Sequence, residues 1–429
     1  MNIGLKIGLL FAFTTVAVSS AQNLSTLYTF QGGTDGSGPD STLIADSKGI
    51  LFGTTQYGGG TACGGLGCGT VFSWSPISGE SVIYRFQGGA DGIGPNGGLA
   101  LGPHGALYGM TTVGGGSGCG GSGCGTIFVL APPTTPGGSW RYQQLYAFQG
   151  GSDGAFPNSY LLQGVAGILL GVTSEGGGSG CSGFGCGTLF ELLLPGNEGG
   201  AWTETVLYRF QGGQRGASPN FGLVPVGNGT FYGVSSNGGG TGCDGAGCGT
   251  VFQLIPAGAS GETWTERTLY SFQGQAANDG AFPGGVPTVG KDGVLYGVTG
   301  AGGSGCAPQF GCGLVYSLTP PASGMLWRET VLYRFVPQWF EPRGAPILDS
   351  SGALYGVSST GYGTYGMVFK LSPPVTDGGW TETLLHSFTD GTDGGLLEGG
   401  LLSIGGVLYG TTFVGPSHCQ CGTIYSLVP

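Results

Sequence analysis

The chain has few charged residues, and basic ones are scarcest. Charged side chains make up 8% of its 429 residues, and 12 Lys and Arg against 23 Asp and Glu give a net charge of −11. Binding to nucleic acid or to an anionic membrane surface needs clustered Lys and Arg, so we expect neither partner. With 11% aromatic residues, the composition favours a neutral partner that hydrogen-bonds and stacks.

Long apolar runs are absent beyond the N-terminus. The chain opens MNIGLKIGLLFAFTTVAVSSAQN, in which Lys6 precedes an apolar run that ends in small residues, the pattern of a cleaved signal peptide. We expect a signal peptide over residues 1–21 and a single mature domain over residues 22–429. No later stretch approaches the roughly 20 apolar residues of a membrane span. We therefore expect a secreted protein, extracellular or periplasmic, with no membrane span and no anchor.

Helical spacing of apolar residues is also missing, and the chain is a tandem repeat. The tetrapeptide LYTF and its relatives occur seven times, at intervals of 53 to 63 residues, and end at Phe30, Phe86, Phe148, Phe210, Phe272, Phe335 and Phe388. Each copy holds four short apolar segments bounded by Gly or Pro, as in residues 96–148, which is typical of β-strands. Seven copies predict an all-β, seven-bladed β-propeller of four-stranded antiparallel blades.

The two ends of the chain complement each other. The last copy offers only three strands after Phe388, whereas residues 23–32 form a strand without preceding partners. Placing that N-terminal strand in the last blade closes the ring and leaves no blade incomplete. We expect a monomer.

Twelve cysteines occur in close pairs, most of them in Gly-rich loops such as GGGTACGGLGCGTVF at residues 58–72. An even number in an exported chain favours disulfides, whereas structural zinc needs four ligands and each copy offers two. We expect no metal and no cofactor. The predicted disulfides are Cys63–Cys68, Cys119–Cys124, Cys181–Cys186, Cys243–Cys248, Cys306–Cys312 and Cys419–Cys421. One intervening residue in the last pair leaves free thiols or a metal contact with His418 as alternatives.

The Cys loops and the Asp-Gly segments between copies are expected on one face of the ring, because both connections emerge on the same side of an antiparallel blade. The Asp-Gly segments then form a partial acidic ring of Asp35, Asp91, Asp153, Asp279 and Asp393. Arg215 replaces the aspartate in copy four. These aspartates either cap tight turns or bind calcium or substrate. Likewise, five tryptophans that begin outer strands either pack or form a sugar-stacking platform; they are Trp140, Trp202, Trp264, Trp327 and Trp380.

Copy six departs most from the repeat, since FVPQWFEPRGAP replaces its Asp-Gly segment and STGYGTYGMVF its Cys loop. We expect a ligand-binding cluster on the loop face, with Arg215 two blades away, unless copy six has merely drifted; its residues are Trp339, Phe340, Arg343, Tyr362 and Tyr365. No nucleophile, His and carboxylate form a recognisable triad, so no catalytic residue is assigned. A binding or structural protein, with an extracellular glycan or cell-surface component as partner, is favoured over a polysaccharide hydrolase or lyase built on the acidic ring.

The recurring pattern LYGTT..GGG...CGTVF.L.P with DG..P upstream, as at residues 51–76 and 107–132, resembles the Gloeo/Verruco repeat of the choice-of-anchor tandem repeat GloVer-containing proteins. The resemblance extends over essentially the whole mature chain. It implies an exported bacterial protein, often carrying a C-terminal surface anchor, and no activity is established for the family as a class. Because this chain shows no anchor pattern, we expect release rather than tethering.

Overall fold

The computed structural model describes residues 23–135, 137–164, 167–195, 200–258, 263–303, 311–322, 326–335, 340–361, 364–375, 378–416 and 419–429. Over these ranges the chain forms β-strands and short 3₁₀ turns, with no α-helix, so the all-β prediction is confirmed. None of the helical turns in the described ranges is long and apolar enough to cross a membrane. The expected signal peptide lies outside the described residues.

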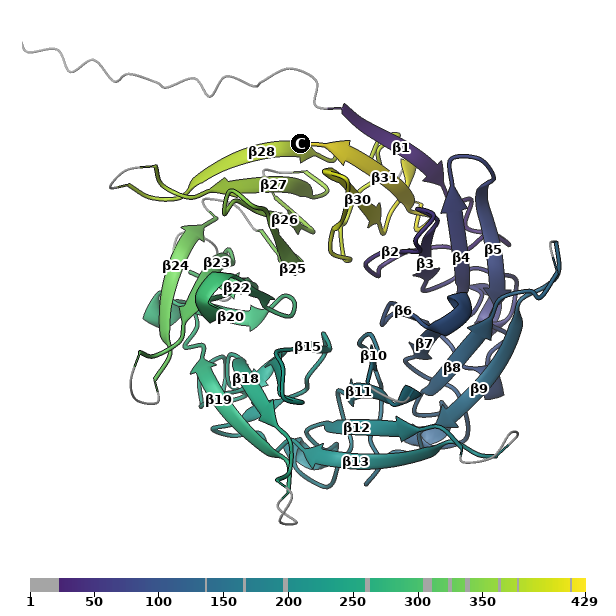
Figure 1. Cartoon of the computed structure of the whole chain (residues 1–429), viewed down its shortest axis with the longest axis horizontal. Coiled ribbons are helices and arrows are strands. Elements are labelled where there is room, and N and C mark those ends of the chain that lie inside the picture. The colour runs from purple at the N-terminus through teal and green to yellow at the C-terminus, as the bar shows by residue number, and fades with distance from the viewer. Residues whose placement is uncertain are drawn as a thin grey trace, which may run out of the picture.

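Seven antiparallel sheets are arranged as the blades of a ring (Figure 1). Blades one to four, from the inner strand outward, are β2–β5 (Ile44–Ala45, Leu51–Thr55, Thr70–Ser75, Gly79–Arg85), β6–β9 (Leu99–Leu101, Leu107–Thr111, Thr126–Ala131, Arg141–Ala147), β10–β13 (Leu162–Gln163, Leu169–Thr173, Thr188–Leu193, Thr203–Arg209) and β15, β16, β18, β19 (Leu223–Pro225, Phe231–Ser235, Thr250–Ile255, Thr265–Ser271). Blades five to seven are β20 and β21 (Gly280–Pro283, Thr288–Val289) with β22–β24 (Leu295–Gly302, Leu314–Thr319, Arg328–Arg334), then β25–β28 (Pro342–Leu348, Leu354–Ser358, Met367–Ser372, Thr381–Ser387), then β29–β31 (Leu402–Ile404, Val407–Thr412, Thr423–Val428).

The two ends of the chain close the ring in blade seven. Strand β1 (Asn23–Thr29) pairs antiparallel with β31, from Asn23 opposite Val428 to Thr29 opposite Thr423. Figure 1 shows β1, near the N-terminus, lying along the last strand of the chain. The seven-bladed propeller and its closure by the N-terminal strand are therefore as the sequence predicts.

The phenylalanine that ends each LYTF-type motif packs between successive blades. Its ring meets an aromatic ring on the third strand of the next blade, at centroid distances of 5.0 to 5.2 Å, in the pairs Phe30–Phe72, Phe86–Phe128, Phe148–Phe190, Phe210–Phe252, Phe272–Tyr316, Phe335–Phe369 and Phe388–Tyr425. All these rings are buried. Edge-to-face pairs of this kind add stabilisation beyond area burial, so the motif forms the hydrophobic core between blades.

Each blade carries a β-bulge between its third and fourth strands, for example between Val71 and Phe72. A bulge increases the twist of a strand pair. The outer strand therefore crosses the rim obliquely, and its first residues reach the last residues of the preceding outer strand (Figure 1). This crossing brings the motif tyrosine of one blade against the outer strand of the next: the rings of Tyr84 and Tyr142 stack at 4.5 Å.

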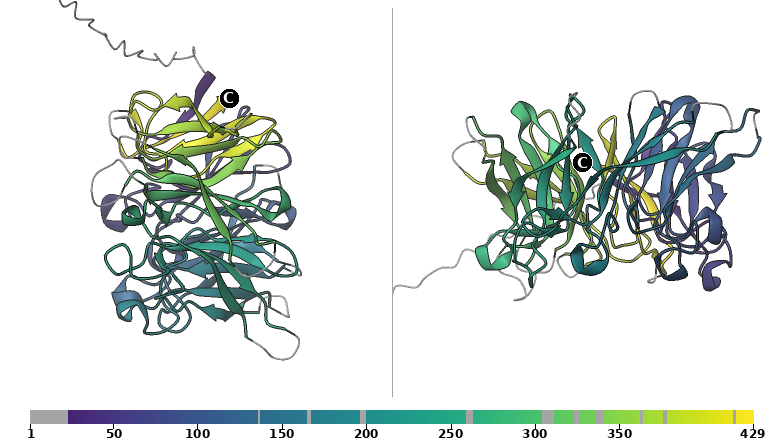
Figure 2. Two further views of the ribbon diagram at one scale, coloured as in Figure 1. Left: turned by 90° about the vertical axis from the view of Figure 1, so that its left-hand side faces the viewer. Right: turned by 90° about the horizontal axis from the view of Figure 1, so that it is seen from below.

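The Cys loops and the connections between blades meet on one face, as predicted. Ser37, in the connection into blade one, exchanges backbone hydrogen bonds with Tyr57, which follows the second strand. The 3₁₀ turns of this face gather along one edge of the disc in Figure 2 (right). We call it the loop face.

Disulfides shape the loops of that face. The structure contains the predicted bonds Cys63–Cys68, Cys119–Cys124, Cys181–Cys186, Cys243–Cys248 and Cys419–Cys421. Cys312 is also disulfide-bonded, and its predicted partner Cys306 lies outside the described residues. His418, which precedes the Cys419–Cys421 pair, lies outside them too. A Cβ atom on Gly88 would lie 3.1 Å from Cys63 Sγ and 3.2 Å from Cys68 Sγ, so this disulfide packs directly against the connection to the next blade.

Candidate functional site

The acidic ring of the loop face serves turn structure. Asp35 Oδ2 accepts hydrogen bonds from the Tyr28 hydroxyl, at 2.9 Å, and from the Gln31 backbone N–H, at 2.8 Å. The same pair of bonds recurs at Asp91, Asp153 and Asp279, and at Asp393 with His386 in place of tyrosine. Each aspartate thus ties the outer strand of one blade to the connection that follows it.

A glutamate from the next outer strand faces several of these aspartates. Burial, and next the Asp35 carboxylate, raise the pKa of Glu80 to about 7. Glu204 and Glu329 stand in the same relation to Asp153 and Asp279, and their pKa values are likewise raised to about 7, chiefly by burial. These Asp–Glu pairs lie at the rim between blades, and the raised pKa values of the glutamates fall near neutral pH.

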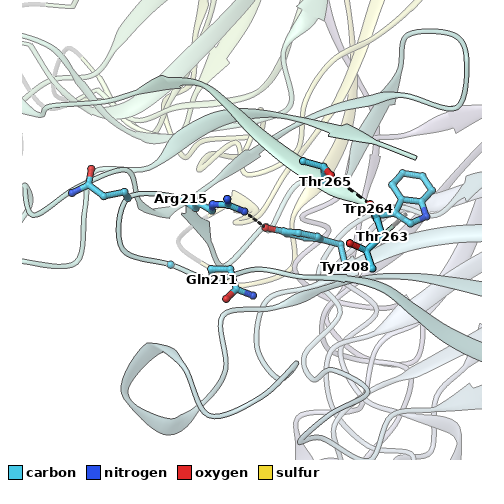
Figure 3. A pocket seen from close by; sticks show the side chains of 8 residues that line it. Tyr208, Gln211, Arg215, Thr263, Trp264 and Thr265 are labelled. Atoms are coloured by element: carbon cyan, nitrogen blue, oxygen red, sulfur yellow. Dashed lines mark hydrogen bonds between the residues drawn. The ribbon is translucent and has the colours of Figure 1, made fainter. Parts of the chain in front are cut away.

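Copy four replaces this arrangement with a different hydrogen-bond chain (Figure 3). Arg215 Nη1 donates to the Tyr208 hydroxyl at 3.3 Å, and that hydroxyl donates to Glu266 Oε2 at 3.2 Å. Glu266 is buried, and its Oε1 accepts from the Gly216 N–H and the Thr268 hydroxyl. Burial raises the pKa of Glu266, while the hydrogen bond to Tyr208 raises the pKa of Arg215. The arginine therefore takes the aspartate's place beside the tyrosine.

A pocket of about 620 Å³ opens beside Arg215, on the rim between blades three and four. It is lined by Tyr208, Gln211, Gly212, Gln214, Arg215, Thr263, Trp264 and Thr265. Figure 3 shows the Arg215 guanidinium directed at Tyr208 between the two walls. We call this the rim pocket.

The tryptophans that begin outer strands are packing residues for the most part. The indole of Trp140 packs on Phe52, that of Trp264 on Phe231, that of Trp327 on Tyr232 and that of Trp380 on Tyr296, at centroid distances of 5.9 to 6.5 Å. All are half-buried. The rings cover the edges of the blades, and only Trp264 lines one of the two pockets described here.

A second set of polar residues stands just before the innermost strands. In six copies this position lies five residues after the loop-face aspartate, or after Arg215 in copy four. In copy six it lies six residues before Asp349. We call these the inner positions; six are polar and one is a glycine, and they are Asp40, Asn96, Asn158, Asn220, Gly284, Arg343 and Glu398. Segments at these positions touch from blade to blade, since a Cβ atom on Gly97 would overlap the Ser159 carbonyl and one on Gly399 would overlap Ser41. They form the inner edge of the loop face.

Three inner positions carry buried oxygen atoms without hydrogen-bond partners among the described residues: Asp40 Oδ1, Asn96 Oδ1 and Asn220 Oδ1. Around blade seven the inner positions are charged. Arg343 forms ion pairs of 3.5 Å with Glu341 and with Glu398, and Ser359 donates to Glu398 at 3.1 Å. Burial raises the pKa of Asp40 well above its ordinary value.

A pocket of about 400 Å³ lies where blade five has no side chain at its inner position. Gly284 stands there between Asn220 and Arg343, and a Cβ atom on it would overlap the Pro342 carbonyl. The pocket is lined by Asn220, Phe221, Ser236, Phe282, Pro283, Gly300, Ala301, Gly311, Phe340, Glu341 and Arg343. We call this the inner pocket.

The residues predicted as one ligand site divide among different places. Phe340 and Arg343 both line the inner pocket, but Phe340 is 1% exposed and stacks on Phe335, so its ring belongs mainly to the core. Half-buried Tyr365 packs against Gly395 and lines neither pocket. Arg215, the candidate expected two blades away from this cluster, lines the rim pocket. Trp339 and Tyr362 lie outside the described residues.

Sequence reasoning missed Asn220, Phe221 and Glu398. A signal for Asn220 was present, because a Pro-Asx dipeptide recurs at Pro39-Asp40, Pro95-Asn96, Pro157-Asn158 and Pro219-Asn220, whereas Glu398 follows a leucine. A proline before each inner position fixes φ and restricts the preceding residue to extended conformations. The dipeptide therefore marks where the chain turns into the innermost strand.

Solved structures share the fold at low sequence identity. A fungal alcohol oxidase of the AA5 family, in complex with copper, is 13% identical, with 96% of this chain and 77% of that one covered and a TM-score of 0.51. The extracellular domain of a protein described as a one component system of B. thetaiotaomicron is 11% identical, with coverages of 94% and 39% and a TM-score of 0.52. At such identities the likeness shows a propeller and nothing about activity.

Comparison of sequences gives a sharper result. No curated protein matches the chain. The model of one repeat family, described as the Gloeobacter/Verrucomicrobia repeat, matches residues 5–190 and again residues 181–425. Because these matches span nearly the whole chain, the protein belongs to the Gloeobacter/Verrucomicrobia repeat family.

Proposed function

We propose that the protein is a secreted binding protein that holds a neutral saccharide in the inner pocket. The observation that carries the proposal is the amide oxygen of Asn220. Asn220 lines the pocket, and its amide oxygen is buried and has no hydrogen-bond partner among the described residues, while Asn220 Nδ2 donates to Ser236 Oγ at 2.9 Å. A buried acceptor left without a donor is costly, and a ligand hydroxyl would satisfy it.

The walls of the pocket suit the two kinds of surface that a sugar presents. Phe221 and Phe282 are half-buried aromatic residues, and aromatic faces accept the C–H faces of a pyranose ring. A few placed polar groups among apolar walls are typical of small-molecule sites, and about 400 Å³ lies within their usual range of volumes. The pocket is therefore large enough for one or two sugar units.

The charge at the pocket favours a neutral or weakly cationic ligand. Arg343 is paired with two carboxylates, of Glu341 and Glu398. The local balance is thus negative, in keeping with the net charge of −11. An acidic ligand would meet uncompensated carboxylates at this site.

The alternative of a polysaccharide hydrolase or lyase rests on the acidic ring. The aspartates of that ring accept bonds from tyrosine hydroxyls and backbone N–H groups at the rim. Turn structure accounts for them, so the binding function has the better support.

Calorimetric titration of the purified protein with neutral oligosaccharides of glucan, mannan and xylan type tests the proposal. We expect saturable binding of at least one of them, weakened about tenfold by Asn220→Leu, since one buried hydrogen bond is worth about 1 kcal/mol and the larger side chain occupies space. Asn158→Leu is the matched control, because Asn158 is the exposed inner position of blade three and lines neither pocket. Unchanged affinity in Asn220→Leu, or no binding by the wild type, would refute the assignment.

A further inference from the structure

The rim pocket differs from the other blade junctions in the residue that stands beside the motif tyrosine. At the position that follows each outer strand, Asp35, Asp91, Asp153 and Asp279 place a carboxylate beside the motif tyrosine. Copy four places the Arg215 guanidinium beside Tyr208 instead. The group beside the tyrosine is therefore a cation in copy four and a carboxylate in those four copies.

The Arg215 guanidinium is held in place by a hydrogen bond to the Tyr208 hydroxyl, and it has no direct ion pair with a carboxylate among the described residues. The Tyr208 hydroxyl accepts a hydrogen bond from Arg215 Nη1 and donates one to Glu266 Oε2, so it lies between the guanidinium and the carboxyl group. Glu266 is 4% exposed and has two further donors, whereas Arg215 is exposed. Of the five N–H donors of an arginine, those not directed at Tyr208 have no partner among the described residues.

The walls around Arg215 carry groups that bind sugar hydroxyls. Gln214 is exposed, and Gln211 uses its amide N–H to reach the Arg209 carbonyl at 2.7 Å, which leaves its amide oxygen as an acceptor. Thr263 and Thr265 are exposed on the opposite wall, beside the half-buried Trp264. A volume of about 620 Å³ lies within the range typical of small-molecule sites.

We propose that the rim pocket binds an acidic saccharide, with the carboxylate of a uronic acid unit held by the Arg215 guanidinium. A planar guanidinium matches a carboxylate in a two-point contact, which an ammonium cannot reproduce. Carboxamide and hydroxyl groups on both walls serve the ring hydroxyls of the same sugar and its neighbour. This site is separate from the inner pocket and takes a ligand of opposite charge preference, so neither assignment depends on the other.

Titration calorimetry with short oligogalacturonides and with their methyl esters is the direct test, because the ester removes the charge and keeps the sugar. At about 0.15 M salt the Debye length is about 8 Å, so the net charge of the protein adds little long-range repulsion. We expect one site per chain for the acid and at least tenfold weaker binding of the ester. Arg215→Gln is expected to lose at least tenfold in affinity for the acid, and Arg141→Gln, which removes an exposed arginine of β9, to lose none.

Arg215→Asp provides a second variant that retains the fold by design. It recreates the Tyr–Asp contact found between Tyr84 and Asp91 and between Tyr146 and Asp153, and we expect it to fold and to bind no oligogalacturonide. Equal affinity for acid and ester, full affinity in Arg215→Gln, or no binding of the acid by the wild type would each overturn the proposal. Displacement of the oligosaccharide by an equimolar amount of inorganic phosphate would do the same, since it would indicate an unspecific anion site.

Discussion

The half-buried glutamates of the Asp–Glu pairs at the rim predict that the protein is less stable at pH 8 than at pH 5. In the folded state the pKa values of Glu80, Glu204 and Glu329 are about 7, against an ordinary value of 4.5. The folded state therefore binds protons more tightly than the unfolded state. Stability must fall as the pH rises from about 4.5 to about 7 and remain reduced above pH 7.

The size of the effect follows from these pKa values. A rise from 4.5 to about 7 sets an upper limit of about 3.4 kcal/mol for each glutamate. The three side chains are only half-buried, so solvent screening reduces the contribution to about 1 kcal/mol each. We expect a difference in the free energy of unfolding of about 3 kcal/mol between pH 5 and pH 8 from the three pairs together.

Urea or guanidinium unfolding of the wild type and of the triple variant Glu80→Gln, Glu204→Gln, Glu329→Gln, at pH 5 and pH 8, measures this difference. Glutamine mimics the protonated acid, so the variant should gain about 3 kcal/mol at pH 8 and little at pH 5. Glu191→Gln, which removes a carboxylate of β12 outside these pairs, is the control. A triple variant whose stability falls between pH 5 and pH 8 as steeply as that of the wild type would refute the reasoning.

Four further predictions concern the fold itself. Replacing Cys63 and Cys68 together by serine should lower the free energy of unfolding by about 2 kcal/mol, because the loop that the bond closes is short, and should raise amide exchange chiefly in that loop. Phe148→Ala should cost about 3 to 5 kcal/mol in denaturant unfolding, since the ring is 1% exposed between two blades. Gly109→Ala should also destabilise the protein strongly, because a Cβ atom there would overlap the Phe128 ring. Removal of residues 23–32 should open blade seven and promote self-association through the free edge of β31.

The repeat made the architecture readable from the sequence. Four short apolar segments in each copy, Gly and Pro at their boundaries and the unmatched strand at residues 23–32 were sufficient, because a blade is local in sequence and its neighbours are copies of itself. The disulfide loops followed from the same spacing. The contact between Tyr28 and Asp35 also had a local signal, since the motif tyrosine precedes the loop-face aspartate by seven residues in three copies.

The candidate sites could be read only in part, because repeat counting assigns a residue to a blade and not to a distance from the ring axis. Arg215 and Arg343 both replace acidic or amide residues in copies of one segment, and the sequence alone places them on one face. In the structure the first stands at the rim and the second at an inner position, five residues further along its copy. The glutamates that face Asp35, Asp153 and Asp279 come from the next blade, about 50 residues away along the chain, and the obliquely crossing outer strands bring them there.

The division between core and polar positions explains where specificity can arise in such a ring. Every blade interface depends on the same phenylalanine contact, so a change there would weaken the closure on which all blades rely. The rim and inner positions lie outside this core. An acidic residue there can be replaced by an arginine where a carboxyl group lies nearby. Glu266 provides that group for Arg215, and Glu341 and Glu398 provide it for Arg343. Arg215 lines the rim pocket and Arg343 lines the inner pocket. This arrangement is expected if binding sites arise by substitution of single polar residues on a fixed scaffold.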